Sequence, residues 1–272
     1  MKVEALHIYP VKGLRGVDLR ESPMEWRGLA HDRRWMLVDA HGMFISQREE
    51  PRLARLRPEL CAGGLQVGDG ASTICIPTPE ADAERLPVTL WGEALEGYRA
   101  TSEADEWFSR FLGKRCRLVY QGDLPRPVPR KYAPEDRHVS FVDALPVLIT
   151  TMESLGDLNR RMEKPLPMNR FRPSLVVSGA EAWSEDSWKM LCIGKLLLSI
   201  AKPCLRCAVT TTDQQTGVRD GREPLATLGK FRRVDQASGS GVAFGQYAVP
   251  LAEGAVAVGE EVAVVEAQAP LC

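Results

Sequence analysis

The chain has 272 residues, of which 44% are hydrophobic and 26% charged, and its formal net charge is −1. These values fit a globular protein with one large domain or two small ones, and the near-neutral charge gives no reason to expect nucleic acid or a membrane as a partner. No apolar run is long enough to span a bilayer. The first residues, MKVEALHIYPVKG, lack the apolar core and cleavage site of a signal peptide. We therefore expect a cytoplasmic protein with reduced thiols.

The first third of the chain is predicted to form mainly short strands. VEALHIY (3–9) alternates apolar and polar residues, as a strand does. RRWMLVD (33–39) and MFISQR (43–48) are predicted to pair around a turn at Ala40, His41 and Gly42. TICIP (73–77) and PVTLW (87–91) indicate further strands. A helix should follow, with Ser102 as its cap, an apolar face and Gly113 at its end.

The second half of the chain begins after QGDLPRPVPRKYAPED (121–136), a charged and proline-rich segment that we interpret as a connection between two units. ALPVLIT (144–150) predicts a buried strand, and Thr150 with Glu153 predicts a capping box for the next helix. Further predicted strands are SLVVSG (174–179), LLLSIA (196–201) and AVTTTD (208–213). DQQTG (213–217) predicts a turn with Gly217 in a left-handed conformation, and EPLATLGKF (223–231) predicts a short helix. GAVAVGEEVAVV (254–265) predicts a closing pair of strands around Gly259.

These elements predict a mainly β protein of the α+β class, with a few helices outside closed or barrel-like sheets. We place an N-terminal unit at residues 1–120 and a second unit at residues 121–267.

Cys204 and Cys207 form a Cys-x-x-Cys pair within KPCLRC (202–207). A structural zinc site needs a second such pair or closely spaced histidines, and the sequence offers neither. A thioredoxin-type pair normally opens a helix, whereas the segment after this pair is predicted to be a strand. From the spacing alone, two ordinary thiols without a function are about as well supported as a functional site. Lys202 and Arg206 place positive charge beside the thiols, which favours a thiolate, a nucleophile and a ligand for soft metals.

Three other basic residues, Lys12, Arg33 and Arg172, stand at the ends of predicted strands. If their side chains converge on one cleft, they suit a phosphate or another anion. Taken singly, each is more often a solvated surface charge, and Asp18, Asp32 and Glu181 are available as simple ion-pair partners. The sequence has no phosphate-binding loop, no GxGxxG motif and no recognisable Ser-His-Asp set.

Seven segments together resemble the MOSC-domain proteins, and more narrowly the branch of mitochondrial amidoxime-reducing components and bacterial YcbX-type reductases of N-hydroxylated bases. The segments are YPVKGLRG, HDRRWMLVD, SQREEPRL, NRFRPSLVVSGAEAWSEDSWKMLCIG, KPCLRCAVTTTD, GREPLATL and FGQY. The resemblance extends from about residue 2 to about residue 266. It implies an N-terminal β-barrel-like domain, a MOSC β-barrel domain, and a molybdenum cofactor bound between them without an attached nucleotide.

The resemblance also implies roles for eleven residues. Cys207, the second cysteine of the pair, would ligate molybdenum and is the expected catalytic residue. The expected contacts to the phosphate and pterin of the molybdopterin are Lys12, Gly13, Arg33, Asp143, Ala144, Leu145, Arg172, Leu205, Arg206 and Tyr247. Gly13 and Leu205 stand where the family usually has serine, so two hydroxyl contacts are replaced by backbone.

The implied activity is the reduction of hydroxylamines, amidoximes or N-hydroxylated bases by oxygen-atom transfer. Its electrons would come from a separate protein of ferredoxin or flavoprotein type. Two alternatives stay open: a sulfur carrier that uses a persulfide on Cys207, and a non-catalytic carrier of the molybdenum cofactor. We expect Cys204 to be structural.

Overall fold

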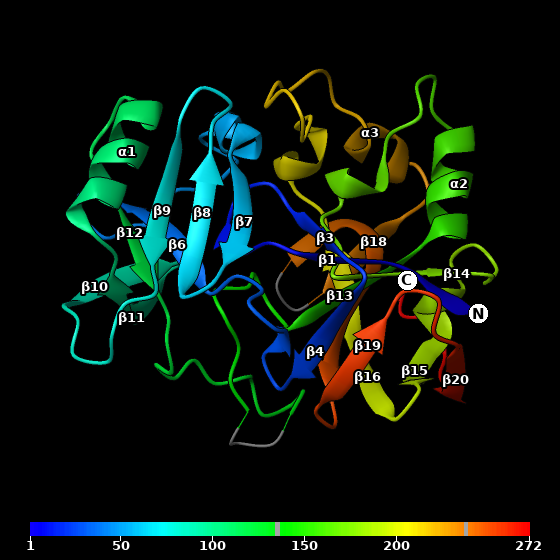
Figure 1. Ribbon diagram of the computed structural model, residues 1–272. Coiled ribbons are helices and arrows are strands. Elements are labelled where there is room, and N and C mark those ends of the chain that lie inside the picture. The colour runs from blue at the N-terminus through cyan, green and yellow to red at the C-terminus, as the bar shows by residue number, and fades with distance from the viewer. Residues whose placement is uncertain (134–136, 237–238) are drawn as a thin grey trace.

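The computed structural model describes residues 1–133, 137–236 and 239–272 (Figure 1). These residues form mainly β structure with a few short helices on the outside, so the predicted fold class is confirmed. Across the described ranges we find no helix that combines the length and apolar character needed to cross a membrane.

The largest sheet of the described chain has nine strands, in the order β20-β15-β16-β18-β13-β14-β1-β3, with β17 beside β18. Its strands are β1 (Lys2–Ile8), β3 (Val17–Leu19), β13 (Val147–Thr151), β14 (Leu175–Ser178), β15 (Trp188–Ile193), β16 (Leu196–Leu205), β17 (Arg233–Gln236), β18 (Gly239–Pro250) and β20 (Val262–Ala267). Lys2 also forms an isolated bridge with Glu261. This bridge joins β1, the strand next to one end of the order, to the residue directly before β20 at the other end, so the sheet curls back on itself.

Three smaller sheets complete the described β structure. One has the order β10-β11-β12-β6-β2, and the other two are β7-β8-β9 and β19-β4-β5. Their strands are β2 (Val11–Lys12), β4 (Glu21–Glu25), β5 (Gly28–Leu29), β6 (Trp35–Asp39), β7 (Arg57–Cys61), β8 (Gly64–Gly68), β9 (Thr73–Pro77), β10 (Arg85–Leu90), β11 (Glu93–Arg99), β12 (Cys116–Tyr120) and β19 (Gly254–Ala257).

Strand pairing crosses the boundary that we expected near residue 120. Strands β1 and β3 lie in the large sheet, and β4 pairs with β19. Figure 1 shows these N-terminal strands beside β13, β16 and β19, away from β6 to β12. Strands β1, β3 and β4 therefore pack with the second half of the chain, whereas β2 pairs with β6.

Two apolar cores follow this division. The larger one lies inside the nine-stranded sheet and includes Leu6, Ile149, Val177 and Leu198, all fully buried. The second packs α1 (Ser102–Leu112) against strands of the smaller sheets through Trp107 and Phe108. Burying one such side chain contributes about 1.5–3 kcal/mol, so both cores fix the strands that carry the site residues.

Both predicted longer helices form, but each is capped one residue away from the predicted position. For α1 the cap is Thr101, whose side chain accepts a hydrogen bond from the backbone N–H of Ala104, and Gly113 ends the helix with φ 68°. For α2 (Met152–Arg160) the cap is Thr151. The predicted capping box is therefore wrong: Thr150 stays in β13, and Glu153 accepts from the N–H of Gly179 instead.

Several shorter predictions differ in detail. AVTTTD is not a strand, because Thr210 and Thr211 donate side-chain hydrogen bonds to carbonyls three residues back and close the 3₁₀ helix η4 (Ala208–Thr211). MFISQR does not form a full strand: it pairs with 33–39, as predicted, through an isolated bridge from Phe44 to Val38, and a second isolated bridge joins Met43 to Thr89. Gly217 adopts the predicted left-handed conformation, with φ 70°. Strands β19 and β20 form as predicted, but they do not pair with each other: β19 pairs with β4, and β20 pairs with β15 in the nine-stranded sheet. The remaining helices are α3 (Leu225–Leu228), η1 (Pro51–Arg55), η2 (Met168–Arg170) and η3 (Ser184–Ser187).

The proline-rich connection packs closely on the rest of the protein over its described residues. Leu124 and Val128 are buried. Arg126 forms an ion pair with Glu93 at 2.9 Å and donates to the carbonyls of Ser140 and Val142. This segment therefore ties the β10–β11 hairpin to the loop before β13. Residues 134–136 of the predicted connection lie outside the described residues.

Candidate functional site

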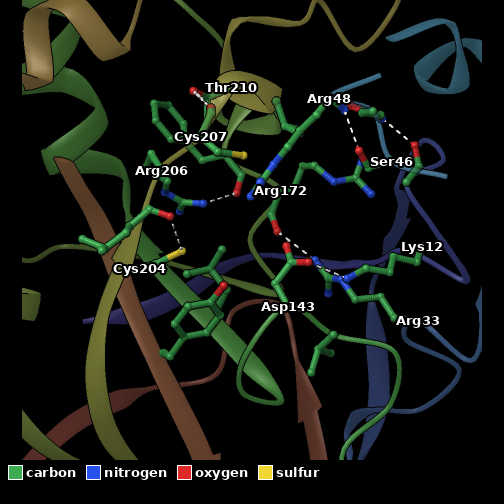
Figure 2. Close-up of a pocket in the computed structure, with 18 of the residues that line it drawn as sticks. Lys12, Arg33, Ser46, Arg48, Asp143, Arg172, Cys204, Arg206, Cys207 and Thr210 are labelled. Carbon is green, nitrogen blue, oxygen red and sulfur yellow. Dashed lines mark hydrogen bonds and ion pairs between the residues drawn. The ribbon is translucent and has the colours of Figure 1, made fainter. Parts of the chain in front are cut away.

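A cavity of about 650 Å³ lies where the N-terminal strands meet the loop before β13 and the ends of β16 and β18 (Figure 2). Ten of the eleven residues predicted from the family resemblance line it: Lys12, Gly13, Arg33, Asp143, Leu145, Arg172, Leu205, Arg206, Cys207 and Tyr247. Ala144 does not line the cavity and packs against the apolar cluster around Val128 and Val142. The fold thus brings together segments that are up to 235 residues apart, since Lys12 and Tyr247 both line the cavity.

Cys207 is held at the point where β16 has ended and η4 begins. Its carbonyl accepts hydrogen bonds from the N–H and the hydroxyl of Thr210, at 3.1 and 2.9 Å. Figure 2 shows its sulfur extending toward the part of the cavity where Arg172 lies. Cys207 is half-buried, whereas Cys204 is only 2% exposed and burial raises the pKa of its thiol. The two thiols of the pair therefore differ in accessibility.

Lys12 and Asp143 form an ion pair across the cavity wall, with 2.5 Å between Nζ and Oδ1. Burial lowers the pKa of Lys12 to about 8, although Asp143 opposes this shift. Burial alone would raise the pKa of Asp143, but Lys12, the indole N–H of Trp91 and Arg33 outweigh it and hold that pKa well below its usual range. Both groups are thus mainly charged at neutral pH.

Arg33 and Arg172 approach the same aromatic ring. Their guanidinium carbons lie 4.5 and 4.1 Å from the ring centroid of Tyr9, a buried side chain. Burial and repulsion by Arg33 lower the pKa of Arg172 to about 10, although nearby acidic groups oppose the shift. Burial would also lower the pKa of Arg33, but its ion pair with the buried Asp32 outweighs that and raises it. A bound anion would relieve the repulsion between the two guanidinium groups.

Arg206 has one donor without a partner. Its Nε donates to the carbonyl of Phe244 at 2.9 Å and its Nη1 to the carbonyl of Phe171 at 3.0 Å. Its buried Nη2 has no hydrogen-bond partner among the described residues. Leaving such a group unsatisfied costs about 1–3 kcal/mol, so Arg206 is prepared to donate to a ligand in the cavity.

The FGQY segment places Tyr247 beside the cysteine pair. Gly245 has φ 76°, and a Cβ at this position would lie 2.5 Å from the carbonyl oxygen of Ile149, so only glycine allows β18 to approach β13 so closely. Tyr247 lies close to Cys204, and burial, together with the neighbouring thiol, raises the pKa of the phenol. The phenol therefore stays protonated next to the cavity.

Sequence reasoning missed several lining residues, among them Phe44, Ser46, Gln47, Arg48, Trp91 and Arg170. A chain of buried amides connects two of the predicted positions. Gln47 donates to the carbonyl of Gly13 at 2.6 Å, and Gln214 donates to Oε1 of Gln47 at 3.0 Å. Arg172 in turn donates to Oε1 of Gln214 at 3.1 Å. The sequence places Gln47 in the predicted strand MFISQR and in the family-like segment SQREEPRL, and neither pattern indicates its contact with Gln214.

The described residues contain no group of three or more His, Cys, Asp or Glu side chains placed to hold a metal ion. A metal near Cys207 would therefore need most of its ligands from a cofactor.

Fold and site together define a mainly β protein with a cation-lined cavity that contains one accessible thiol. Residues 1–115 match the MOSC N-terminal beta barrel domain, and residues 136–263 match the MOSC domain. The chain is therefore a member of the MOSC-domain family, and more narrowly it belongs with the amidoxime-reducing components, as the following identities show.

Mitochondrial amidoxime-reducing component 1 of Homo sapiens is 34% identical over 96% of this chain and 82% of its own length. The component 1 protein of Danio rerio is also 34% identical, over 96% of this chain and 83% of its own length. Mitochondrial amidoxime reducing component 2 of Homo sapiens is 34% identical over 86% of this chain and 73% of its own length.

Proposed function

We propose that this protein is a molybdenum-cofactor-dependent reductase of N-hydroxylated compounds such as hydroxylamines, amidoximes and N-hydroxylated bases. The observation that carries the proposal is the accessible thiol of Cys207 in a cavity lined by Lys12, Arg33, Arg172 and Arg206. The names of the relatives, amidoxime-reducing components, support the same activity.

The residues present fit this cofactor. The phosphate of a molybdopterin is an anion, and the cavity offers several cations together with the unpartnered Nη2 of Arg206. The dithiolene of the pterin brings two sulfur ligands, so a single protein thiolate is sufficient to complete a soft donor set. In this proposal Cys207 ligates the metal, and Lys12, Arg33, Arg172 and Arg206 hold the phosphate and pterin. Gly13, Asp143, Leu145, Leu205 and Tyr247 line the remaining walls.

When bound, the cofactor would supply two-electron oxygen-atom transfer that cleaves an N–O bond. The protein's own residues contribute position and charge. Thr210 fixes the Cys207 turn, Asp143 keeps Lys12 in place, and the partly buried Tyr247 keeps its proton. We propose that a separate redox protein of ferredoxin or flavoprotein type delivers the electrons. We also propose a cytoplasmic location, which cell fractionation would test.

The decisive experiment measures molybdenum per protein chain and reduction of benzamidoxime by chemically reduced viologen. It compares the unchanged protein with Cys207→Ala and Cys204→Ser, each purified from cells that make the cofactor. We expect near-stoichiometric molybdenum and turnover in the unchanged protein, and at least about tenfold less of both in Cys207→Ala. Cys204→Ser should keep its molybdenum, because Cys204 borders the cavity but is only 2% exposed, whereas the thiol of Cys207 is accessible.

Other outcomes would select one of the alternatives. Persulfide sulfur on Cys207 without molybdenum would point to a sulfur carrier. Full molybdenum content without turnover, even with reduced viologen, would point to a carrier of the cofactor. Loss of molybdenum in Cys204→Ser but not in Cys207→Ala would contradict the assigned roles of the two cysteines.

A further inference from the structure

Trp91 occupies a turn that is unfavourable for its own backbone. Strands β10 and β11 pair through Leu90 and Glu93, which leaves Trp91 and Gly92 as a two-residue hairpin loop. Both loop residues have positive φ, 54° for Trp91 and 87° for Gly92. Two positive φ angles are typical of a type I′ turn, where asparagine, aspartate or glycine normally precedes the glycine. A bulky side chain there is a backbone outlier, and such outliers cluster at functional sites.

The indole of Trp91 is firmly held although 46% of the residue is exposed. Its Nε1 donates to Oδ1 of Asp143 at 2.9 Å. Its ring lies edge-on to Phe44, with 5.3 Å between centroids, and the guanidinium of Arg48 lies 4.3 Å from its centroid. Within the described residues, Arg48 has no acidic partner. The Arg126–Glu93 ion pair fixes the hairpin itself against the loop that carries Asp143.

A second tryptophan makes the same kinds of contact without lining the cavity. Trp183 also has positive φ, 69°, donates to Asp157 at 2.9 Å and has Arg232 over its ring at 4.4 Å. Trp183 is packed edge-on against Phe231 and Phe244 and does not line the cavity. Trp91, Phe44 and Arg48 do line it, together with Cys207.

We propose that Trp91 is a specificity-determining residue. Trp91 and Phe44, with the guanidinium of Arg48, form the wall of the cavity against which a planar substrate packs. The wall favours flat, uncharged N-hydroxylated compounds such as aromatic amidoximes over small hydroxylamines, because only a flat ring gains stacking contacts. The cations around the cavity disfavour positively charged substrates. The inference rests on the proposed reductase function and adds to it the residue that selects the substrate.

The test compares Trp91→Asn, Trp91→Phe and Trp183→Asn. Asparagine suits the type I′ turn, so the hairpin of Trp91→Asn is expected to form. We expect the KM for benzamidoxime to rise about three- to tenfold in Trp91→Asn, while the KM for hydroxylamine changes far less. Trp91→Phe keeps an aromatic face but lacks the N–H that donates to Asp143, so its KM for benzamidoxime should stay close to that of the unchanged protein. Trp183→Asn should leave the ratio of the two KM values unchanged.

Calorimetric titration with benzamidoxime in the absence of electrons provides a second measurement, which does not need turnover. Weaker binding to Trp91→Asn than to Trp91→Phe, at equal molybdenum content, is the expected result. Equal binding to both variants, or a parallel rise of both KM values in Trp91→Asn, would overturn the proposal and assign Trp91 to holding Asp143 alone. If no protein turned over either substrate, the reductase proposal would fail while the titration still tested the wall.

Discussion

Lys12 shows how one residue links burial to a pH-dependent site. It is only 4% exposed, and its charge is retained near neutrality because Asp143 lies 2.5 Å away. The same burial that makes the ammonium a strong electrostatic partner also brings its pKa down to about 8. The site therefore has a titrating cation close to physiological pH.

On the proposed function, we predict that the protein retains the molybdenum cofactor less well as the pH rises through about 8. Below this pKa the ammonium attracts an anion, and the protonated fraction falls about tenfold for each further pH unit. Molybdenum content after gel filtration at about pH 7 and about pH 9 measures the effect. Lys12→Met should retain little molybdenum at either pH, and Lys189→Met, which removes an exposed charge paired with Glu266, should behave as the unchanged protein. If Lys12→Met instead bound molybdenum at about pH 7 and lost it by about pH 9 to the same extent as the unchanged protein, Lys12 would be ruled out as the titrating group.

The start of α2 packs against a buried carboxyl group, Glu185, whose ionised form is unfavourable in the folded protein. Thr151 and Ser154 both donate hydroxyl hydrogen bonds to Oε2 of Glu185, at 3.1 and 2.8 Å. Glu185 is fully buried, and its Oε1 has no partner among the described residues. Burial raises the pKa of Glu185 to about 7, although the two hydroxyl groups oppose the shift.

We predict that Glu185→Gln stabilises the protein at pH values above about 7. The folded-state pKa is higher than that of the unfolded chain, so the folded state binds more protons between about 4.5 and 7 and loses stability as the pH rises through this window. Removing the charge should add about 1–3 kcal/mol to the free energy of unfolding at about pH 8 and much less at about pH 5. Urea denaturation at both pH values checks this, with the exposed Glu163→Gln as control. A gain of equal size at both pH values would show that ionisation is not the cause.

At the scale of the whole molecule, the amide chain from Gly13 through Gln47 and Gln214 to Arg172 joins the two halves of the cavity. Gln47 and Gln214 are 2% and 4% exposed, so their hydrogen bonds do not compete with water. The chain therefore sets where Arg172 lies relative to the turn after Lys12.

We predict that Gln214→Met weakens anion binding as well as stability. The change removes the acceptor of Arg172 and leaves Gln47 partly unsatisfied, which should cost about 1–3 kcal/mol in the free energy of unfolding. Molybdenum retention should fall in parallel. Gln121→Met is the matched control, because this buried amide bonds the carbonyls of Leu124 and Val139 and does not line the cavity. If both variants lost stability and both kept their molybdenum, the amide chain would have no role in holding the cofactor.

Of the twenty strands that the structure describes, local patterns predicted nine, and they also predicted the three α-helices, because apolar alternation and glycine turns act within a few residues. Local patterns failed where tertiary contacts decide between two adjacent residues of equal local propensity. Thr150 and Thr151 have the same side chain, and the cap falls on Thr151 because β13 stays paired with β14 up to that residue. Trp91 looked like a strand residue, and only the Leu90–Glu93 pairing places it in a turn.

The candidate site could be predicted only as far as family motifs reached. Those motifs named ten residues that line the cavity, but not the Gln47–Gln214 contact, whose partners are 167 positions apart. No spacing rule connects two glutamines at that separation.

The placement of β1 in the nine-stranded sheet has a consequence for synthesis of the protein. Strand β1 leaves the ribosome long before one of its two partners, β14, which begins at Leu175, and the Glu261 that bridges to Lys2 comes later still. One edge of β1 can pair with β3 at once, but the edge that pairs with β14 must remain solvated or shielded until more than half of the chain has emerged, whereas each of the strands β6 to β12 has a partner within residues 35–120. Residues 35–120 can thus begin to fold early in synthesis, whereas the pairing of β1 with β14 can form only after the second half of the chain has been made.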